Sequence, residues 1–241
     1  MEIKMMTYKN LPSKKYKLSR GATAITFKTT DGRVLKRYLD NEVYKRLLEF
    51  HNGDFLSFLI ELDKIDSDLF VDMDEVFIGS KKRVGAMTYE YQAGTTIKDL
   101  YPKHDLIRLR EALIIADKNL RELEDIKLRD IHYNNILYTG DIKIIDTDFC
   151  MLTDENVTSQ NVAHVNDAVI RGLFDMDINT RLVVDPRLKG VYESCMHGET
   201  GAYEFLDEYM KLEKREKGRC HYYKHLSKDY IGEKYGIFGR R

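Results

Sequence analysis

The sequence predicts an α+β protein, with a strand-rich N-terminal third before a mostly helical remainder. Residues 16–39 alternate loosely between polar and apolar side chains around a turn at 30–32, as antiparallel strands do. Residues 104–124 instead repeat apolar side chains every three or four positions, which is the spacing of a helix with one buried face. We therefore expect two domains, residues 1–91 and 92–241.

The N-terminal domain is expected to hold an antiparallel sheet and two helices. The helical patterns cover residues 41–51 and 54–65, and Asn52-Gly53 separates them. A further pair of strands is predicted at residues 69–78 and 84–91.

The C-terminal domain is expected to be mainly helical. After the helix over 104–124 comes a polar stretch at 153–160, and helices are predicted over 166–174 and 201–213. Residues 211–241 carry ten Lys or Arg against four acidic residues, and this basic tail is expected to be a solvated surface, and binding of an acidic partner is the alternative.

Composition places the chain among ordinary soluble globular proteins. Of its 241 residues 43% are hydrophobic and 33% charged, and the net charge of −1 predicts neither nucleic-acid nor anionic-membrane binding. Cys150, Cys195 and Cys220 are too few for a disulfide framework, so we expect reduced thiols in a cytoplasmic protein. The sequence contains no apolar run of the roughly 18 residues that a membrane span needs.

The most informative segment runs from Leu128 to Phe149. Asp130 precedes Asn135 by five residues, and an apolar run, a Thr-Gly-Asp turn and a second apolar run then lead to Asp146. A hairpin of this kind would bring the three oxygen-bearing side chains to neighbouring strand ends. Phosphoryl transfer needs one carboxylate beside the attacking hydroxyl and oxygen ligands for the Mg²⁺ on the phosphates.

The segment resembles the catalytic loop of the protein-kinase-like superfamily. Leu128-Arg129-Asp130 is similar to the His-Arg-Asp motif with its histidine replaced, and Asp130 to Asn135 also fits the Asp-x-His-x-x-Asn form of aminoglycoside and choline kinases. The resemblance implies a bilobal kinase-like fold. It also implies that Asp130 orients the acceptor hydroxyl and receives its proton, while Asn135 holds Mg²⁺.

Two aspartates compete for the second metal position. Asp146 directly follows an apolar strand and resembles the aspartate of the Asp-Phe-Gly motif, which binds the Mg²⁺ that bridges the phosphates. Asp148 is the alternative, because Phe149 follows it, although Cys150 replaces the glycine of that motif. We favour Asp146.

The same resemblance extends to the ATP-binding residues of the N-terminal domain. Gly21 stands in the register of a glycine-rich phosphate loop whose outer glycines are replaced. Lys36 ends a strand similar to the Val-Ala-Ile-Lys strand of kinases, which implies that it pairs with the α- and β-phosphates. Glu61 is the favoured partner of Lys36 because its neighbours are apolar, and Glu42 and Glu49 are alternatives.

Two further segments fit the resemblance. The backbone of Glu90 and Tyr91 would hydrogen-bond adenine in the hinge between the lobes. Asp167 and Gly172 match the helix that braces the catalytic loop in protein kinases, in which the aspartate is buried; a solvated acid at a helix N-terminus is the alternative.

The implied activity is transfer of the γ-phosphoryl group from ATP to a hydroxyl, with Mg²⁺. Both a protein Ser/Thr and a small molecule remain open as acceptor, because the loop resembles both kinds of kinase. The alternative is a pseudokinase, a nucleotide-binding or protein-interaction module, which the poor glycine loop favours.

Overall fold

A computed structural model describes five stretches of the chain, which divides into two compact units, Met1–Ala93 and Gly94–Arg241. The described residues are 1–7, 9–79, 83–100, 106–173 and 187–217. Each unit is described by itself below. The fold is α+β, as predicted: a six-stranded sheet in the first unit, and helices with small sheets in the second.

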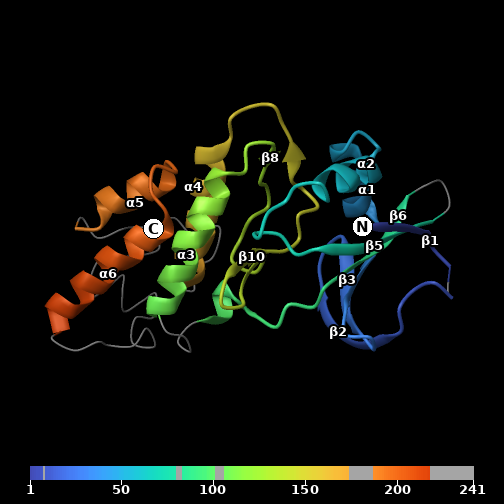
Figure 1. The fold of residues 1–241 in the computed structure, drawn as a ribbon, viewed down its shortest axis with the longest axis horizontal. Coiled ribbons are helices and arrows are strands. Elements are labelled where there is room, and N and C mark those ends of the chain that lie inside the picture. Colours follow the sequence, from blue (N-terminus) through green and yellow to red (C-terminus); the bar gives the residue numbers. More distant parts are fainter. Residues whose placement is uncertain (8, 80–82, 101–105, 174–186, 218–241) are drawn as a thin grey trace. The chain divides into compact units, whose positions relative to one another are not determined.

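The first unit is built on a mixed sheet (Figure 1). Its strand order is β1-β5-β6-β4-β3-β2. Its strands are β1 Glu2–Met5, β2 Lys14–Arg20, β3 Ala24–Thr29, β4 Val34–Tyr38, β5 Met73–Ile78 and β6 Val84–Tyr89. Four neighbouring pairs are antiparallel, as predicted. The prediction of a purely antiparallel sheet is wrong at one edge, because β1 pairs with β5 in parallel.

Helices α1 (Glu42–Phe50) and α2 (Phe55–Leu62) cover one face of this sheet and confirm the two predicted helices. Their side chains meet the sheet at Tyr38, whose ring lies 5.1 Å from that of Tyr44 and 5.7 Å from that of Phe55. Asn41 and Asp54 accept hydrogen bonds from the first turn of their respective helices, so both helices begin at side-chain caps.

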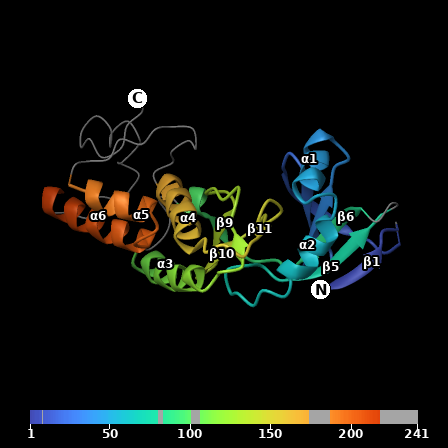
Figure 2. The ribbon, with the colours of Figure 1, turned by 90° about the horizontal axis from the view of Figure 1, so that it is seen from above.

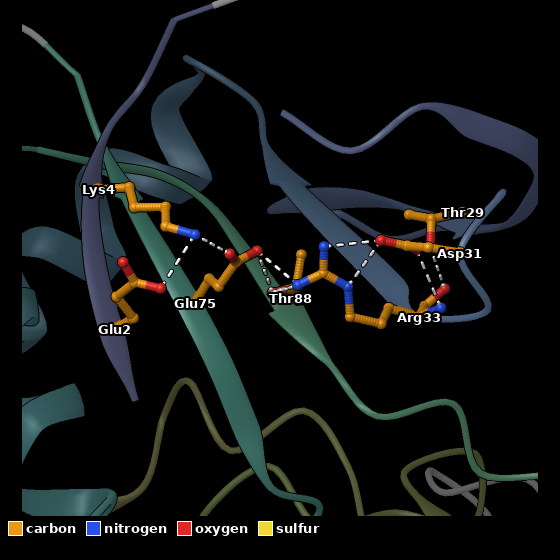
Figure 3. Close-up of polar contacts among 7 residues, drawn as sticks. All are labelled: Glu2, Lys4, Thr29, Asp31, Arg33, Glu75 and Thr88. Atoms are coloured by element: carbon orange, nitrogen blue, oxygen red, sulfur yellow. Dashed lines mark hydrogen bonds and ion pairs between the residues drawn. The ribbon is translucent and has the colours of Figure 1, made fainter. Parts of the chain in front are cut away.

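The opposite face of the sheet carries a small apolar cluster and a polar network. Leu35, Phe77 and Ala86 are buried there, and residues 6 and 11 pack against them. In the network, the Lys4 ammonium and the Arg33 guanidinium both bind the Glu75 carboxylate (Figure 3). Because Lys4 lies on β1, the network fastens this parallel strand to the rest of the sheet.

Within its described residues, the second unit contains four α-helices that pack on one another (Figure 2). They are α3 Leu106–Arg121, α4 Thr158–Leu173, α5 Lys189–Met196 and α6 Ala202–Lys217. The predicted helices near 104–124 and 201–213 are confirmed, whereas α5 was not predicted. Among the described residues, no helix has the length and apolar character needed to cross a membrane.

Helix α4 begins eight residues earlier than the predicted start at 166. Its first half is polar in sequence, which is why residues 153–160 were expected to lie outside a helix. Two of its polar side chains, Asn161 and Asn166, are nevertheless buried and hydrogen-bonded to backbone groups. A hydrophobicity pattern that counts asparagine as an exposed residue therefore places the start of α4 too late in the sequence.

The described part of the second unit also contains two short sheets and a 3₁₀ helix. They comprise β7 Thr95–Thr96, η2 Ile97–Leu100, β8 Ile126–Lys127, β9 Ile136–Tyr138, β10 Ile142–Ile144 and β11 Met151–Leu152. The predicted hairpin is β9 and β10, joined by a turn in which Gly140 has a φ of 109°, a conformation that favours glycine. β7 pairs with β9, and β11 pairs with β8.

Candidate functional site

The β9–β10 hairpin brings two of the predicted site residues together. Asn135 directly precedes β9, and Asp146 follows β10 by two residues. The strands pair Ile136 with Ile144, and the Ile145 N–H donates to the Asn135 carbonyl at 2.8 Å, which extends the pairing by one residue. The sequence-based expectation that these residues lie at neighbouring strand ends is therefore confirmed for Asn135 and Asp146.

Asn135 also holds the loop that carries Asp130. Its side-chain nitrogen donates to the Asp130 carbonyl at 3.0 Å, and its backbone N–H donates to the His132 carbonyl at 2.8 Å. The side chain is 7% exposed. Because the amide nitrogen is used in the loop, the amide oxygen is the atom that would serve as a metal ligand.

Asp130 and Asp146 share an unusual backbone conformation. Their φ angles are 56° and 62°, and Asn52, in the turn between α1 and α2, is the other non-glycine residue with a positive φ in the described chain. Such a conformation costs free energy for a residue with a Cβ and is held by the surrounding contacts; it recurs at functional sites. Both aspartates are exposed.

Asp148 differs from Asp146 in its surroundings. It is 1% exposed, whereas Asp146 is an exposed residue at the end of the hairpin. A ligand of a metal on a bound nucleotide must reach the solvent-accessible side of the site, so this contrast favours Asp146 as the metal ligand. The sequence alone left Asp148 open as the rival.

Cys150 lies behind these three aspartates. Burial is the main cause that raises the pKa of its thiol to about 12. A hydrogen bond with the Arg129 backbone lowers the pKa, and the negative charges of Asp148, Asp146 and Asp130 raise it. The thiol is therefore protonated at neutral pH.

A buried asparagine of α4 braces the strand that leads into the Asp130 loop. The side-chain oxygen of Asn161 accepts from the Leu128 N–H at 2.8 Å, and its nitrogen donates to the Ile126 carbonyl at 2.8 Å. His164, one turn later, contacts the Leu128 carbonyl through Nδ1 at 3.1 Å. Sequence reasoning missed both residues. The one signal in the sequence is the position of Asn161 four residues before the apolar Val165, which is the spacing of one helix face.

The bracing role expected of Asp167 is not what the structure shows. Asp167 lies in the second half of α4, is partly exposed, and forms an ion pair with Arg171 at 2.8 Å. Both sequence-based readings of this residue are wrong, because it is neither a buried aspartate nor an acid at a helix N-terminus. The brace comes instead from Asn161.

Gly172 contributes to the same loop through close packing. A Cβ at this position would lie 2.7 Å from the Tyr133 Cβ and 2.6 Å from the Ile97 Cγ2. Tyr133 belongs to the segment between Asp130 and Asn135. Glycine therefore lets α4 approach the loop. The sequence motif pointed to this residue, and close packing is the reason that a glycine is needed there.

In the first unit, Lys36 is placed on the helix-covered face of the sheet. It lies on β4, is 7% exposed, and has its ammonium 5.5 Å from the centre of the Tyr38 ring. A lysine this deeply buried on a strand is unusual for a simply solvated side chain.

The glutamates expected to pair with Lys36 face the solvent. Glu61 is about half exposed and pairs with Lys64 at 2.7 Å, while Glu42 pairs with Lys45 at 2.6 Å. Glu49, on the same helix as Glu42, is exposed. The expectation that Glu61 occupies an apolar environment is wrong, because its apolar sequence neighbours point to the other side of α2.

The loop at Gly21 closes the β2–β3 hairpin. The Gly21 N–H donates to the Ala24 carbonyl at 2.9 Å, so this amide is occupied within the turn. The side-chain nitrogen of Asn41 donates to the Ala22 carbonyl at 2.9 Å and thereby ties the loop to the start of α1. A phosphate-binding role for this loop would fall to the amides of Ala22 and Thr23.

Glu90 and Tyr91 follow directly after β6. The Glu90 N–H approaches the Asp72 carbonyl at 3.4 Å, and the Lys28 ammonium lies 3.3 Å from the centre of the Tyr91 ring. These contacts fix the segment against the sheet of the first unit. They leave its predicted role in adenine binding as a prediction.

The donor set fits a magnesium ion carried by a nucleotide better than a metal held by protein alone. In the described part of the chain, no three His, Cys, Asp or Glu side chains are grouped to hold a metal ion. Mg²⁺ typically takes one or two carboxylates together with phosphate oxygens and water. Asp146 and the Asn135 amide oxygen match that smaller requirement.

Comparison with known proteins gives no family assignment, since no family model and no curated protein matches the chain.

Proposed function

We propose that the protein is an ATP- and Mg²⁺-dependent phosphotransferase with a protein-kinase-like fold. The observation that carries the proposal is the pair Asp130 and Asp146, both held at positive φ and linked through Asn135. The sequence motif selected these residues without any knowledge of their backbone conformation. The α+β architecture and the buried Lys36 support the same proposal.

Each residue has a defined role in the proposed reaction. Asp130 would orient the acceptor hydroxyl and accept its proton, while Asn135 and Asp146 would hold Mg²⁺ through one oxygen each. Lys36 would pair with the α- and β-phosphates. The metal ion would neutralise charge on the phosphate oxygens, and catalysis would otherwise come from positioning. Both a protein Ser/Thr and a small-molecule hydroxyl remain open as acceptors.

The test is turnover of labelled ATP with Mg²⁺ in the presence of a panel of peptides and metabolites. Asp130→Asn and Asp146→Asn should each lower turnover on the order of 100-fold or more, because each removes a charge that acts in the transition state. Asparagine tolerates positive φ, so both variants should fold. Asp141→Asn, in the exposed turn of the same hairpin, is the matched control and should retain activity.

A pseudokinase is the second candidate, and specific observations favour it. The Gly21 amide is engaged within its own hairpin, and Glu61 and Glu42 are each paired with a lysine three residues further along the chain. This candidate predicts thermal stabilisation by ATP without turnover. Absence of both turnover and nucleotide-induced stabilisation would contradict the phosphotransferase and the nucleotide-binding form of the pseudokinase.

A further inference from the structure

The N-terminal part of the chain is strongly basic although the whole chain is nearly neutral. Residues 3–30 contain seven Lys or Arg and no Asp or Glu, within a protein that has 39 basic and 40 acidic residues. Most of these cations lie on the β2–β3 hairpin. All seven residues of β2 are exposed, and β2 is the last strand of the sheet.

Two irregularities in the strand pairing gather three of these cations on one face. Lys14, Lys17 and Arg20 stand opposite Thr29, Phe27 and Ile25, which alternate along β3. The register shifts once between Lys14 and Tyr16 and again between Lys17 and Ser19. In a regular strand, residues three apart face opposite sides, so the two bulges are what place these cations in one row.

The row lies on the face of the sheet opposite α1 and α2. Phe27 pairs with Leu35 of the apolar cluster on that face, and Ile25 pairs with Arg37, which adds a fourth exposed cation. Phe27 and Ile25 are partly exposed. The surface therefore combines a row of cations with accessible apolar side chains.

These cations lack the acidic partners that neighbouring charges have. On the same face, Arg33 is bound by Asp31 and Glu75, and Lys4 by Glu2 and Glu75 (Figure 3). Within the described residues, by contrast, the cations of the row and Arg37 contact no carboxylate. Lys14 instead lies over the Phe27 ring, 4.4 Å from its centre. The positive charge of this surface is thus uncompensated.

The shape of β2 excludes one mode of binding and favours another. Bulges and lysines on an edge strand hinder the addition of a further strand, so a ligand would bind through side chains. The row repeats at every second residue of β3, about 6.6 Å, which is the spacing of alternate side chains in an extended peptide. A single-stranded nucleic acid would require open aromatic rings for stacking, whereas Lys14 covers Phe27 and Tyr16 faces the other side.

We propose that this surface, formed by Lys14, Lys17, Arg20, Arg37, Ile25 and Phe27, docks an extended acidic segment of another protein. Alternate carboxylates of the segment, which share one face of an extended chain, pair with the row of cations. The surface consists of the outer face of the sheet alone, and the proposal does not depend on the phosphotransferase activity.

The test is fluorescence anisotropy of the full chain with a labelled peptide in which Glu and Val alternate. The triple variant Lys14→Glu, Lys17→Glu, Arg20→Glu should weaken binding by at least about tenfold, because it turns three attractive contacts into repulsive ones. The control is the triple variant Lys118→Glu, Lys189→Glu, Lys211→Glu. It makes the same change of net charge at exposed helix positions of the second unit. That control should bind the peptide as the parent does.

The possible outcomes separate docking from general attraction. Weaker peptide binding by the Lys14, Lys17, Arg20 variant alone, with unchanged thermal unfolding, supports the proposal. Equally weakened peptide binding in both triple variants, or no binding of the peptide by the parent protein, would overturn it. So would tighter binding of a thymidine oligonucleotide or of anionic vesicles at the same ionic strength.

Discussion

Single asparagine side chains hold several of the loops that carry the candidate site residues. Asn135 joins the Asp130 loop to the β9–β10 hairpin, Asn161 holds the strand before that loop, and Asn41 ties the Gly21 loop to α1. An amide offers both a donor and an acceptor, so one side chain can bind two backbone groups that run in different directions. Neutral side chains do this without the desolvation cost of a buried charge.

Asn41 allows its two functions to be separated experimentally. Asn41→Ser keeps a helix-capping oxygen but is too short to reach the Ala22 carbonyl, so we expect unchanged thermal stability and several-fold weaker ATP binding. Asn41→Ala removes the cap as well and should lower stability by about 1 kcal/mol. Thermal unfolding with and without ATP measures both effects. Unaltered ATP affinity in Asn41→Ser would exclude a role for the tether.

Among the secondary-structure elements, α4 has the largest influence on the second unit. It braces β8 through Asn161, meets the Asp130 loop through Gly172, and contacts the turn before α6 through Asn166. Displacement of this one helix would therefore change the loop that carries Asp130.

Gly172→Ala tests the close approach between α4 and the loop. Alanine favours a helix over glycine by about 1 kcal/mol, but its methyl group would overlap Tyr133 and Ile97. We expect a net loss of about 1–3 kcal/mol in the free energy of unfolding, measured with urea. Gly190→Ala in α5 is the matched control, because a Cβ at that position would have no neighbouring atom within 4 Å. That variant should be neutral or slightly stabilised.

The order of the main elements was predictable because their periodicity is strong. The β9–β10 hairpin and helices α1, α2 and α3 follow from local alternation, caps and turn residues. β1 was not predictable in this way, because four residues leave little pattern and their partner β5 lies far along the sequence. Helix α4 was misplaced because its buried asparagines look like surface residues in a sequence.

The candidate site was predictable to the extent that it depends on chain order. A hairpin between Asn135 and Asp146 brings those residues together whatever surrounds them. The environment of Glu61 was not predictable, since apolar sequence neighbours on a helix can occupy the opposite side. Nor does the sequence reveal the positive φ of Asp130, which depends on contacts with Asn135 and its neighbours.

The whole molecule combines a sheet unit and a helical unit that are stabilised differently. Buried apolar side chains of α3, α4 and α6 dominate the second unit. The first unit adds an ion-pair network across β1, β5 and the β3–β4 turn. Its stability should therefore respond more strongly to acid.

In this network the Arg33 guanidinium, together with Thr29, lowers the pKa of Asp31 from 3.8 to about 2. Burial raises the pKa of Glu75, but hydrogen bonds from Lys4 and Arg33 outweigh it and lower the pKa overall. Depressed carboxyl pKa values add stability above the unfolded-state values, and this stability is lost as the pH falls toward about 2. Solvent screening limits the Asp31 contribution to about 1 kcal/mol or less.

Arg33→Met should accordingly flatten the dependence of unfolding free energy on pH in the acid range. Urea unfolding followed from neutral pH down to about 2 measures this dependence. In a background that carries Asp31→Asn and Glu75→Gln, the same substitution should produce no further flattening. A parent protein whose stability does not change across this range would contradict the assigned role of the network.

The parallel pairing of β1 with β5 also has a consequence for how the chain folds. β2, β3 and β4 pair with strands that are close to them in sequence. β1 pairs with β5, and Glu2 lies opposite Glu75, so this pairing closes a loop that includes β2 to β4 and both helices. Contacts between distant parts of a chain carry the larger loop-closure entropy. β1 therefore cannot join its sheet before β5 has been synthesised, and until the two strands pair β5 presents an unpaired edge.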